Sequence, residues 1–365
     1  MKKLTRYLMI FLAVMTASCE KAPVDNTSTG IELVPPLGYI SFRTDVATKT
    51  PIITSLKGQT FGVFGFSYSN TTDWGTARAV ASPDIFQNMA VTCDENGVPS
   101  YDADAGVAGN QLTPWNLLKL YSFFAYYPYG NSNVVFNNEL KTDLPIVTYT
   151  LPLDSSPVNP DNLVDLMTAH AIDHDPVKDA VVSFNEEYTE GAPVAKFQHR
   201  LFCIEVVSQN FNDNTNELIR NPELVISNLK YKSISVPLQR GDSKFSPTMV
   251  ERPAGNITFD ITETTDAEIT VHAQNDPAYT GPVSVSGTKN VMLIPQERLE
   301  GEVVFELYNS ETGVWESKSQ PFESKINFEE GKKYTLSVNF TGDAIVIVLS
   351  EAGSWEPFSV NYEFA

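Results

Sequence analysis

The residues with the clearest potential for chemistry are two histidines near the middle of the chain. His170 and His174 are four positions apart, and Asp173 and Asp175 lie beside them. On a helix, that spacing would place two zinc ligands on one face. The segment AHAIDHDP is more typical of a loop, and it has neither the glutamate of an HExxH motif nor a third ligand nearby. We therefore expect no metal site here and no other cofactor.

Other catalytic or ligand-binding patterns are weaker still. Asp102 and Asp104, followed by Gly106, resemble the start of a calcium loop but lack its remaining oxygen ligands and its closing glutamate. Neither a glycine-rich phosphate loop nor a GxSxG motif is present. Paired carboxylates are frequent in so acidic a chain and indicate nothing without geometry. The sequence therefore predicts a protein that is not an enzyme.

The cysteine at position 19 has a more specific context. A basic segment and a short apolar run within residues 2–15 lead through small residues into Cys19. That order is typical of a secretory signal peptide, because the apolar run is too short to span a bilayer. The segment resembles a bacterial lipobox, in which the cysteine thiol is acylated, for example with palmitate, and becomes the mature N-terminus. The alternative is an ordinary signal peptide with a coincidental cysteine. We expect residues 1–18 to be removed and the polar, proline-bearing residues 19–37 to act as a lipidated tether.

Charge and composition narrow the class of protein. The formal net charge is −20 and the isoelectric point about 4.5, so the surface repels nucleic acid and we expect no nucleic-acid partner. Hydrophobic residues make up 42% of the chain, which is enough to build substantial cores. Cys93 and Cys203 are flanked by apolar residues typical of core strands. Buried thiols are therefore the favoured interpretation, and one disulfide is the alternative.

Nearly every apolar segment after residue 37 has the length and composition of a β-strand. These segments are rich in Val, Ile, Phe, Tyr and Thr and are bounded by Gly, Pro, Asn and Asp. We predict strands at Gly38–Val46, Thr60–Tyr68, Leu120–Tyr127, Lys196–Val207, Glu223–Ile226, Asn256–Ile261, Glu268–His272, Asn290–Ile294, Glu302–Tyr308, Lys333–Phe340 and Ala344–Leu349. Short helical turns are expected only near Ser82–Phe86 and Asn116–Lys119.

The sequence therefore predicts an all-β chain of two tandem β-sandwich domains. Residues 173–191 are strongly charged and precede a strong predicted strand, which favours a boundary near residue 195. We expect an N-terminal sandwich at 38–195 and a C-terminal sandwich at 196–365. Long connections such as Phe136–Asp161 favour Greek-key topology over simple hairpins.

A series of local patterns runs along the chain. The patterns are ISFR at 40–43, FGVFGF at 61–66, YSFFAYYP at 121–128, DLMTA at 165–169, FQHRL at 197–201 and GKKYTL at 331–336. In order, spacing and position behind a lipobox, they resemble the fimbrillin family, which contains subunits and tip or anchor proteins of the lipoprotein-derived (type V) pili of Gram-negative anaerobes. The resemblance implies two transthyretin-like sandwiches, a place in a fimbrium or on the outer membrane, and assembly by strand exchange.

The resemblance also implies how the first strand is used. In stem subunits of that family, a protease specific for Arg or Lys removes the lipidated segment with the first strand, and a strand from a neighbouring subunit fills the vacated groove. In this chain Ile40, Phe42 and Val46 lie on the apolar face of the candidate displaced strand. Arg43 and Lys49 are the candidate cleavage positions.

The C-terminal end has a complementary pattern. Phe358, Val360, Tyr362 and Phe364 alternate with polar residues almost to the end of the sequence, which gives a candidate donor strand with one apolar face. The alternative is that each terminal strand pairs within its own domain.

The function predicted from these features is structural and adhesive. We expect a fimbrial subunit or a tip or anchor protein that assembles with copies of itself or with other fimbrial subunits. It would be held on the outer membrane by its N-terminal lipid and would contact a host or bacterial surface receptor. The alternative is a glycan-binding outer-membrane lipoprotein. That function would need exposed tryptophans, whereas tryptophans in sandwiches usually fill the core; the four in this chain are Trp74, Trp115, Trp315 and Trp355.

Overall fold

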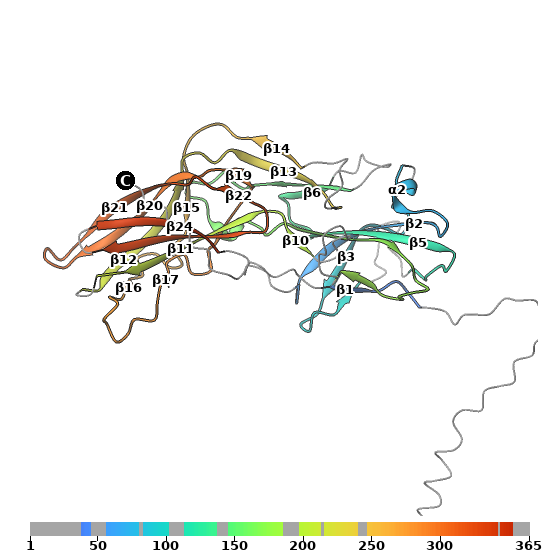
Figure 1. Cartoon of the computed structure of the whole chain (residues 1–365), viewed down its shortest axis with the longest axis horizontal. Coiled ribbons are helices and arrows are strands. Elements are labelled where there is room, and N and C mark those ends of the chain that lie inside the picture. The colour runs from blue at the N-terminus through green and yellow to red at the C-terminus, as the bar shows by residue number, and fades with distance from the viewer. Residues whose placement is uncertain are drawn as a thin grey trace, which may run out of the picture. The chain divides into compact units, whose positions relative to one another are not determined.

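The computed structural model describes residues 38–44, 56–79, 83–101, 113–136, 145–184, 197–212, 215–239, 247–341 and 344–352. Within these ranges the chain is almost entirely β-structure (Figure 1), and the predicted all-β fold is confirmed. The signal peptide, the tether and several candidate residues lie outside the described residues. These candidates are Cys19, Val46, Lys49, Phe358, Val360, Tyr362 and Phe364.

The described part of the chain contains strands in both its first and its second part. Strands of the first part are β1 (Phe42–Thr44), β2 (Thr60–Ser69), β3 (Phe86–Cys93), β4 (Pro99–Ser100), β5 (Lys119–Tyr127), β6 (Val134–Phe136), β7 (Ile146–Thr150), β8 (Met167–His174), β9 (Val182–Phe184) and β10 (Gln198–His199). Strands of the second part are β11 (Phe202–Asn210), β12 (Glu217–Ile226), β13 (Tyr231–Pro237), β14 (Thr248–Glu251), β15 (Ile257–Asp260), β16 (Ile269–Val271), β17 (Val283–Ser284), β18 (Val291–Leu293), β19 (Gln296–Glu297), β20 (Glu300–Asn309), β21 (Val314–Glu323), β22 (Asn327–Phe328), β23 (Lys333–Thr341) and β24 (Ala344–Ala352). The helical elements are α2 (Trp74–Ala77) and a 3₁₀ turn, η1 (Pro160–Asn162).

The central element of the first part is a six-stranded antiparallel sheet in the order β10-β8-β5-β2-β3-β4. Its middle strands β2 and β5 are buried at nearly every position, not at alternate positions. A strand buried on both faces needs a continuous apolar sequence. This requirement explains the runs of aromatic residues in these two strands.

The two faces of this sheet have different covers. On one face, Phe64 packs against Phe136 of β6 with ring centroids 5.4 Å apart. Strand β6 belongs to a four-stranded sheet in the order β14-β13-β7-β6. On the other face, Phe123 packs against Phe42 of β1, which forms a two-stranded sheet with β9. Figure 1 shows β6 and β13 on one side of β2 and β5, and β1 on the other.

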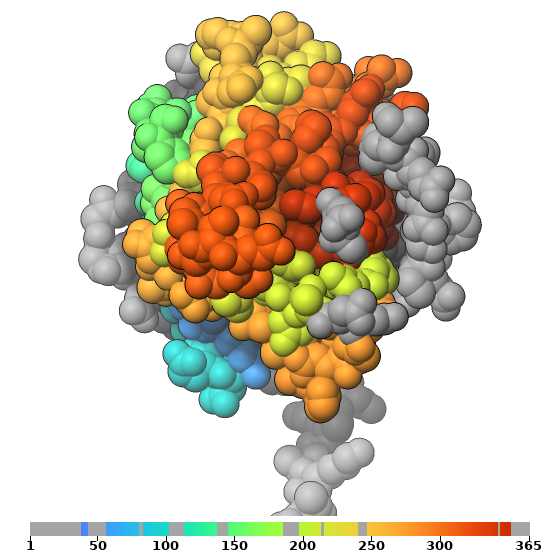
Figure 2. Space-filling model, turned by 90° about the vertical axis from the view of Figure 1, so that its left-hand side faces the viewer, coloured from blue at the N-terminus to red at the C-terminus, as the bar shows by residue number. Residues whose placement is uncertain are grey.

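The second part is a sandwich of two further sheets. One has the order β17-β11-β23-β24, with β18 also paired to β11, and the other has the order β15-β12-β20-β21, with β16 also paired to β12. The rings of Phe305 and Phe340 meet between the sheets with centroids 6.0 Å apart. Strands β21 and β24 lie side by side at one end of this sandwich, where the orange hairpin and the red strand adjoin in Figure 2.

The described strands do not divide cleanly at the predicted domain boundary. Strands β6 and β7 precede residue 195 and strands β13 and β14 follow it, yet β7 and β13 are hydrogen-bonded in one sheet. Gly38–Ala365 forms one compact unit of the chain. The two-domain organisation with a boundary near residue 195 therefore stays a prediction.

Some local expectations are wrong. Residues around His170 form β8, not a loop, and the connection Phe136–Asp161 contains β7. Phe86 begins β3, and Asn116–Lys119 is a turn leading into β5, so neither place is helical. The helix that does form, α2, begins after Asp73, whose carboxylate accepts a hydrogen bond from the Thr76 N–H, as at many helix starts.

Cys93 and Cys203 are both buried thiols, as favoured by their apolar flanks. Cys93 ends β3 in the six-stranded sheet, and Cys203 lies in β11 of the second sandwich. None of the described helices is long and apolar enough to cross a membrane.

Candidate functional site

The backbone of β1 is held on both sides by segments distant in sequence. Strand β1 pairs in parallel with β9, so that Phe42 lies opposite Val182, and the Val182 N–H donates to the Ser41 carbonyl at 2.8 Å. On the other side, the Ile40 N–H donates to the Thr113 carbonyl at 2.9 Å. The residues that lead into and form β1 therefore occupy a slot between two other backbones, and removing them would break a hydrogen bond to each.

The side chain of Phe42 is enclosed by aromatic rings. It is 5% exposed, and its ring lies 5.5 Å from Phe123, 5.7 Å from Phe184, and 6.0 Å from both Phe86 and Tyr101, between ring centroids. Such pairs contribute about 0.5–1.5 kcal/mol each beyond the burial of their area. We call these four enclosing residues, together with the two described next, the aromatic pocket.

The aromatic pocket continues beneath β9. Phe184 packs edge-on against Phe61 at 6.3 Å and against Phe197 at 5.8 Å, and these last two rings lie 5.2 Å apart. All three side chains are fully buried. The pocket thus extends past the position of Phe42, in the direction in which β1 runs beside β9.

A tyrosine fastens the start of the strand. The Tyr101 hydroxyl donates to the carbonyl of Ile40 at 2.7 Å, and Ile40 is itself 1% exposed. Burial raises the pKa of Tyr101 to about 12, so its hydroxyl stays a donor at neutral pH. No local pattern predicts this contact, because Tyr101 is 61 positions from Ile40 along the chain.

Trp115 joins the beginning of β1 to the end of β8. Its indole N–H donates to the Ala180 carbonyl at 2.9 Å, and its ring stacks on His174 with centroids 5.2 Å apart. The backbone N–H of Trp115 donates to Gly38 at 3.3 Å, next to a bridge between Tyr39 and Pro114. These contacts fix where the chain enters the slot.

The structure thus brings together Ile40 and Phe42, the two described members of the predicted first strand, and buries both. Arg43 lies in the middle of β1, opposite Ser183. A protease needs an extended, accessible backbone, so cleavage after Arg43 requires β1 to leave β9. The roles of Arg43 and of the candidate residues outside the described ranges stay predictions.

The histidine pair does not form a ligand set. His170 is 2% exposed; burial, and to a lesser extent the positive charge of Arg200, lower its pKa to about 4. Asp173 adopts φ +54° and accepts hydrogen bonds from the Tyr68 hydroxyl at 2.6 Å and the Trp74 N–H at 2.7 Å. The described residues contain no group of three ligands suited to a metal. This segment instead ties β8 to β2 and α2.

A cluster of polar side chains, most of them buried, lies near the connection from β10 to β11. His199 Nδ1 and Asp165 Oδ1 are 2.8 Å apart, and Arg200 contacts Glu330 at 3.2 Å. Burial raises the pKa of the nearby Cys203 thiol to about 12. A catalytic cysteine needs a thiolate at neutral pH, so this cysteine is not activated as a nucleophile.

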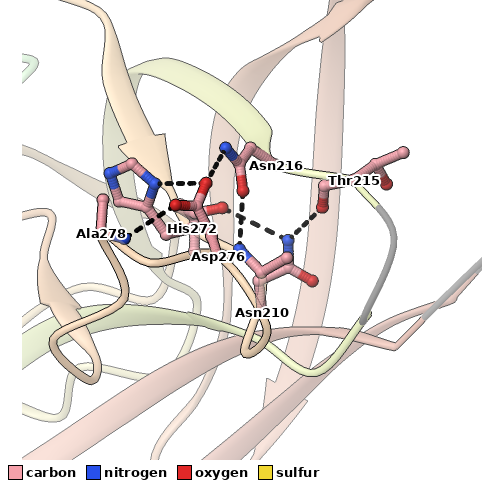
Figure 3. Close-up of polar contacts among 8 residues, drawn as sticks. Asn210, Thr215, Asn216, His272, Asp276 and Ala278 are labelled. Carbon is pink, nitrogen blue, oxygen red and sulfur yellow. Dashed lines mark hydrogen bonds and ion pairs between the residues drawn. The ribbon is translucent and has the colours of Figure 1, made fainter.

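A second histidine–aspartate pair lies on the surface of the second sandwich (Figure 3). His272 Nδ1 is 3.2 Å from Asp276 Oδ2, which also accepts from the Asn216 side chain at 2.5 Å. The Ala278 N–H, followed by Asn216 and His272, lowers the pKa of Asp276 to about 2. The network joins the loop after β16 to the start of β12, and Figure 3 shows no nucleophile beside the imidazole among the residues drawn. The His272–Asp276–Asn216 network therefore stabilises the loop after β16.

The described tryptophans do not make a sugar platform. Trp74 and Trp115 are 2% and 9% exposed and belong to the core. Trp315 is half-buried, the guanidinium of Arg220 lies 4.4 Å from its ring centroid, and the ring of Tyr308 is inclined by 55° to it. One face of Trp315 is therefore already occupied.

Comparison with known proteins identifies the family to which this chain belongs. A fimbrillin-like family model matches residues 48–355, so the chain belongs to the fimbrillin-like family, and the predicted resemblance is confirmed. No curated protein matches the chain.

One of three solved structures that match the chain supports its fold. A crystal structure of a fimbrial protein from Bacteroides vulgatus matches 86% of this chain and 97% of its own, with 17% identity and a TM-score of 0.60. A fimbrial assembly protein from Parabacteroides distasonis matches 87% of this chain and 96% of its own at 14% identity and a TM-score of 0.35. The tip fimbrial protein Mfa3 from Porphyromonas gingivalis matches 86% of this chain and 98% of its own at 9% identity and a TM-score of 0.29. Only the first of these three is similar enough to support the fold.

Proposed function

We propose that this chain is a fimbrial subunit, or a tip or anchor protein, that assembles when a strand of a neighbouring subunit replaces β1 over the aromatic pocket. The observation that carries the proposal is the enclosure of Phe42 by four rings, in a strand whose three described residues lie outside the main sheet. The protein acts as a structural and adhesive component without catalysis.

The exchange is physically reasonable because the incoming strand forms the same kinds of contact that β1 loses, namely buried apolar side chains and backbone hydrogen bonds. Burying Phe42 and Ile40 contributes roughly 1.5–3 kcal/mol each, and each backbone hydrogen bond contributes about 0.5–1.5 kcal/mol net. A strand with the same alternation regains all of these contributions. A donor strand that forms more backbone hydrogen bonds than the three described residues of β1 would draw the exchange towards itself.

The C-terminal segment of this chain suits the donor role. Phe358, Val360, Tyr362 and Phe364 provide four apolar side chains at every second position, with aromatic rings at three of them. An aromatic pocket favours such a strand over an aliphatic one. The partners are therefore other fimbrial subunits, either copies of this chain or different ones.

Delivery and location follow from the N-terminal segment. Acylation at Cys19 would hold the chain on the outer membrane with β1 still in place, and cleavage after Arg43 or Lys49 would separate the lipid and open the pocket. A chain that keeps Cys19 would instead remain a permanent anchor. Adhesion to a surface receptor would be carried out by the exposed regions of the assembled fimbrium.

Two measurements test the proposal. Deleting Pro357–Ala365 should abolish incorporation into polymers while the monomer keeps its thermal stability, and unchanged polymerisation would exclude this donor. The N-terminal residue of protein recovered from the cell surface separates the forms. A lipidated Cys19 indicates an anchor, whereas Thr44 or Thr50 indicates a processed subunit.

A further inference from the structure

Three strongly exposed apolar side chains stand on separate loops of the first part of the chain. Tyr39 is 56% exposed, Leu118 is 74% exposed and Val177 is 66% exposed. We call these three residues the loop patch. Loop tips usually carry polar residues, so apolar side chains on three converging loops need an explanation.

The three loops meet around Trp115. Tyr39 forms a bridge with Pro114, the residue before Trp115, and Leu118 follows Trp115 by three positions. The Trp115 indole bonds the carbonyl of Ala180, three positions after Val177. All three loops therefore lie at the same end of the six-stranded sheet, where β5 begins and β8 ends.

The loops are ordered by their own hydrogen bonds. The Leu118 N–H donates to the Asn116 side chain at 2.9 Å, and the Leu118 carbonyl accepts from the Asn70 N–H at 3.2 Å. The Val177 N–H donates to the Asp175 carboxylate at 3.0 Å. Because the tips are already fixed, docking them costs little conformational entropy.

The distance between Cys19 and the loop patch is limited by the chain segment that joins them. Residues 19–37 connect Cys19 directly to this end of the sheet through Gly38. A chain segment of that length reaches at most about 65 Å. A lipid on Cys19 would therefore keep the loop patch within reach of the bilayer at all times. This step rests on the lipidation included in the proposed function.

We propose that this end of the lipidated chain rests on the lipid surface and inserts the loop patch into the headgroup region. Tyrosine is suited to that depth because its ring is apolar and its hydroxyl is polar, while leucine and valine reach the acyl boundary. Exposed side chains on three separate loops suit a fluid lipid surface, because the lipids can adapt to each of them. The acidic chain, with Asp175 and Asp179 beside Val177, fits a zwitterionic surface better than an anionic one. Tyr39 leaves with β1 on cleavage, so the contact belongs to the unprocessed form.

The test attaches the protein to vesicles through a single acyl chain that is too weak to hold the protein there without further contacts. The chain from residue 19 onward is alkylated at Cys19 with a single C14 chain, which gives only marginal membrane binding. Partition onto phosphatidylcholine vesicles is then measured by sedimentation. The neutral double variant Leu118→Ser with Val177→Thr should lower the partition coefficient about tenfold. Restoring Leu118 alone should recover part of that loss.

A matched control separates the loop patch from exposed apolar area in general. Val135 and Val314 are 59% and 55% exposed and lie in β6 and β21. Val135→Ser with Val314→Ser should leave the partition coefficient within twofold of the wild type. Equal partition of the loop-patch variant and the wild type, with unchanged melting temperatures, would overturn the proposal. A loop-patch variant that partitions normally but fails to polymerise would overturn it too, in favour of a contact with another subunit.

The outcome is independent of the strand-exchange proposal. The C14 chain is attached chemically, so the measurement does not require native acylation of Cys19. If surface protein lacks a lipidated Cys19 but the loop-patch variant still loses partition, the proposed delivery fails and the membrane contact stands. If native lipidation is found and the variant shows no loss, the membrane contact fails alone.

Discussion

The two faces of the six-stranded sheet are equally rich in aromatic residues but are covered in different ways. One face lies against a four-stranded sheet in which β7 pairs with β6 through three residue pairs and with β13 through five. The other face lies against β1, which pairs with β9 through three residue pairs. The first cover is built from the middle of the chain, so it cannot leave without unfolding its neighbours. The second is the first strand of the described chain, and it is the cover that the proposed strand exchange would replace.

Removing β1, the cover of the second face, should have the largest effect on stability. A chain lacking residues 1–44 exposes Phe86, Phe123 and Phe184, and we expect it to lose roughly 5 kcal/mol or more of unfolding free energy. A peptide of residues 357–365 should raise its melting temperature, because it refills the aromatic pocket. A peptide with serine at the four apolar positions is the control. A truncated chain as stable as the intact one would show that β1 does not complete the fold.

Substitution within the cover should have the next largest effect. Phe42→Ala should cost about 3–5 kcal/mol, because it leaves a cavity among four rings. Tyr39→Ala, two positions earlier and exposed, should cost less than about 0.5 kcal/mol. Urea unfolding at pH 7.5 measures both. Equal effects of the two substitutions would contradict the enclosure of Phe42.

The six-stranded sheet should respond to acid through His170 of β8, which is paired with Phe124 of β5 on the face that the four-stranded sheet covers. The pKa of His170 is about 4 in the folded chain, whereas in the unfolded chain it is near 6.5. The unfolded state therefore binds the proton first, so stability is full above pH 6.5 and falls as the pH drops towards 4. Between pH 7.5 and 4.5 this loss should be roughly 2–3 kcal/mol. His170→Gln should reduce the acid loss by that amount in urea unfolding at the two pH values. An unchanged acid loss in the variant would show that His170 is not responsible.

The smallest effect should come from the hydroxyl that fastens β1. Tyr101→Phe keeps the ring contacts with Phe42 and Phe86 but leaves the buried Ile40 carbonyl without this donor, at a cost of about 1–2 kcal/mol. Hydrogen exchange of the β1 amides should accelerate about tenfold. The matched control is Tyr39→Phe, an exposed tyrosine whose substitution should change neither quantity. If exchange accelerates throughout the sheet and not in β1 alone, Tyr101 stabilises the whole fold and not the first strand in particular.

Local composition was enough to predict the fold class and most long strands. The apolar runs of β2, β5, β11, β20 and β23 are visible because strands buried between layers require them. Strand β21 was missed because its sequence, VWESKSQPFE, carries charges and a proline at a sheet edge. Strand β8 was missed because charged neighbours made His170 and His174 look like loop residues.

Of the candidate site, only the residues of the first strand could be predicted from the sequence. The alternation of Ile40 and Phe42 indicates a one-sided strand, and both residues are buried as expected. Nothing in the sequence connects that strand to β9, which lies within the charged segment predicted to separate two domains, or to the hydroxyl of Tyr101. These contacts join residues about 60 to 140 positions apart, and local periodicity holds no information about such pairings.

The pairing of β7 with β13 has a mechanical consequence. If the two parts of the chain met only through the segment Phe197–Leu201, a pulling force on the protein would stretch it at that point. Here the backbone pairs from Ile146–Pro237 to Thr150–Ser233 cross the same place. Any tension applied across the two parts would therefore load several backbone hydrogen bonds together with the covalent chain.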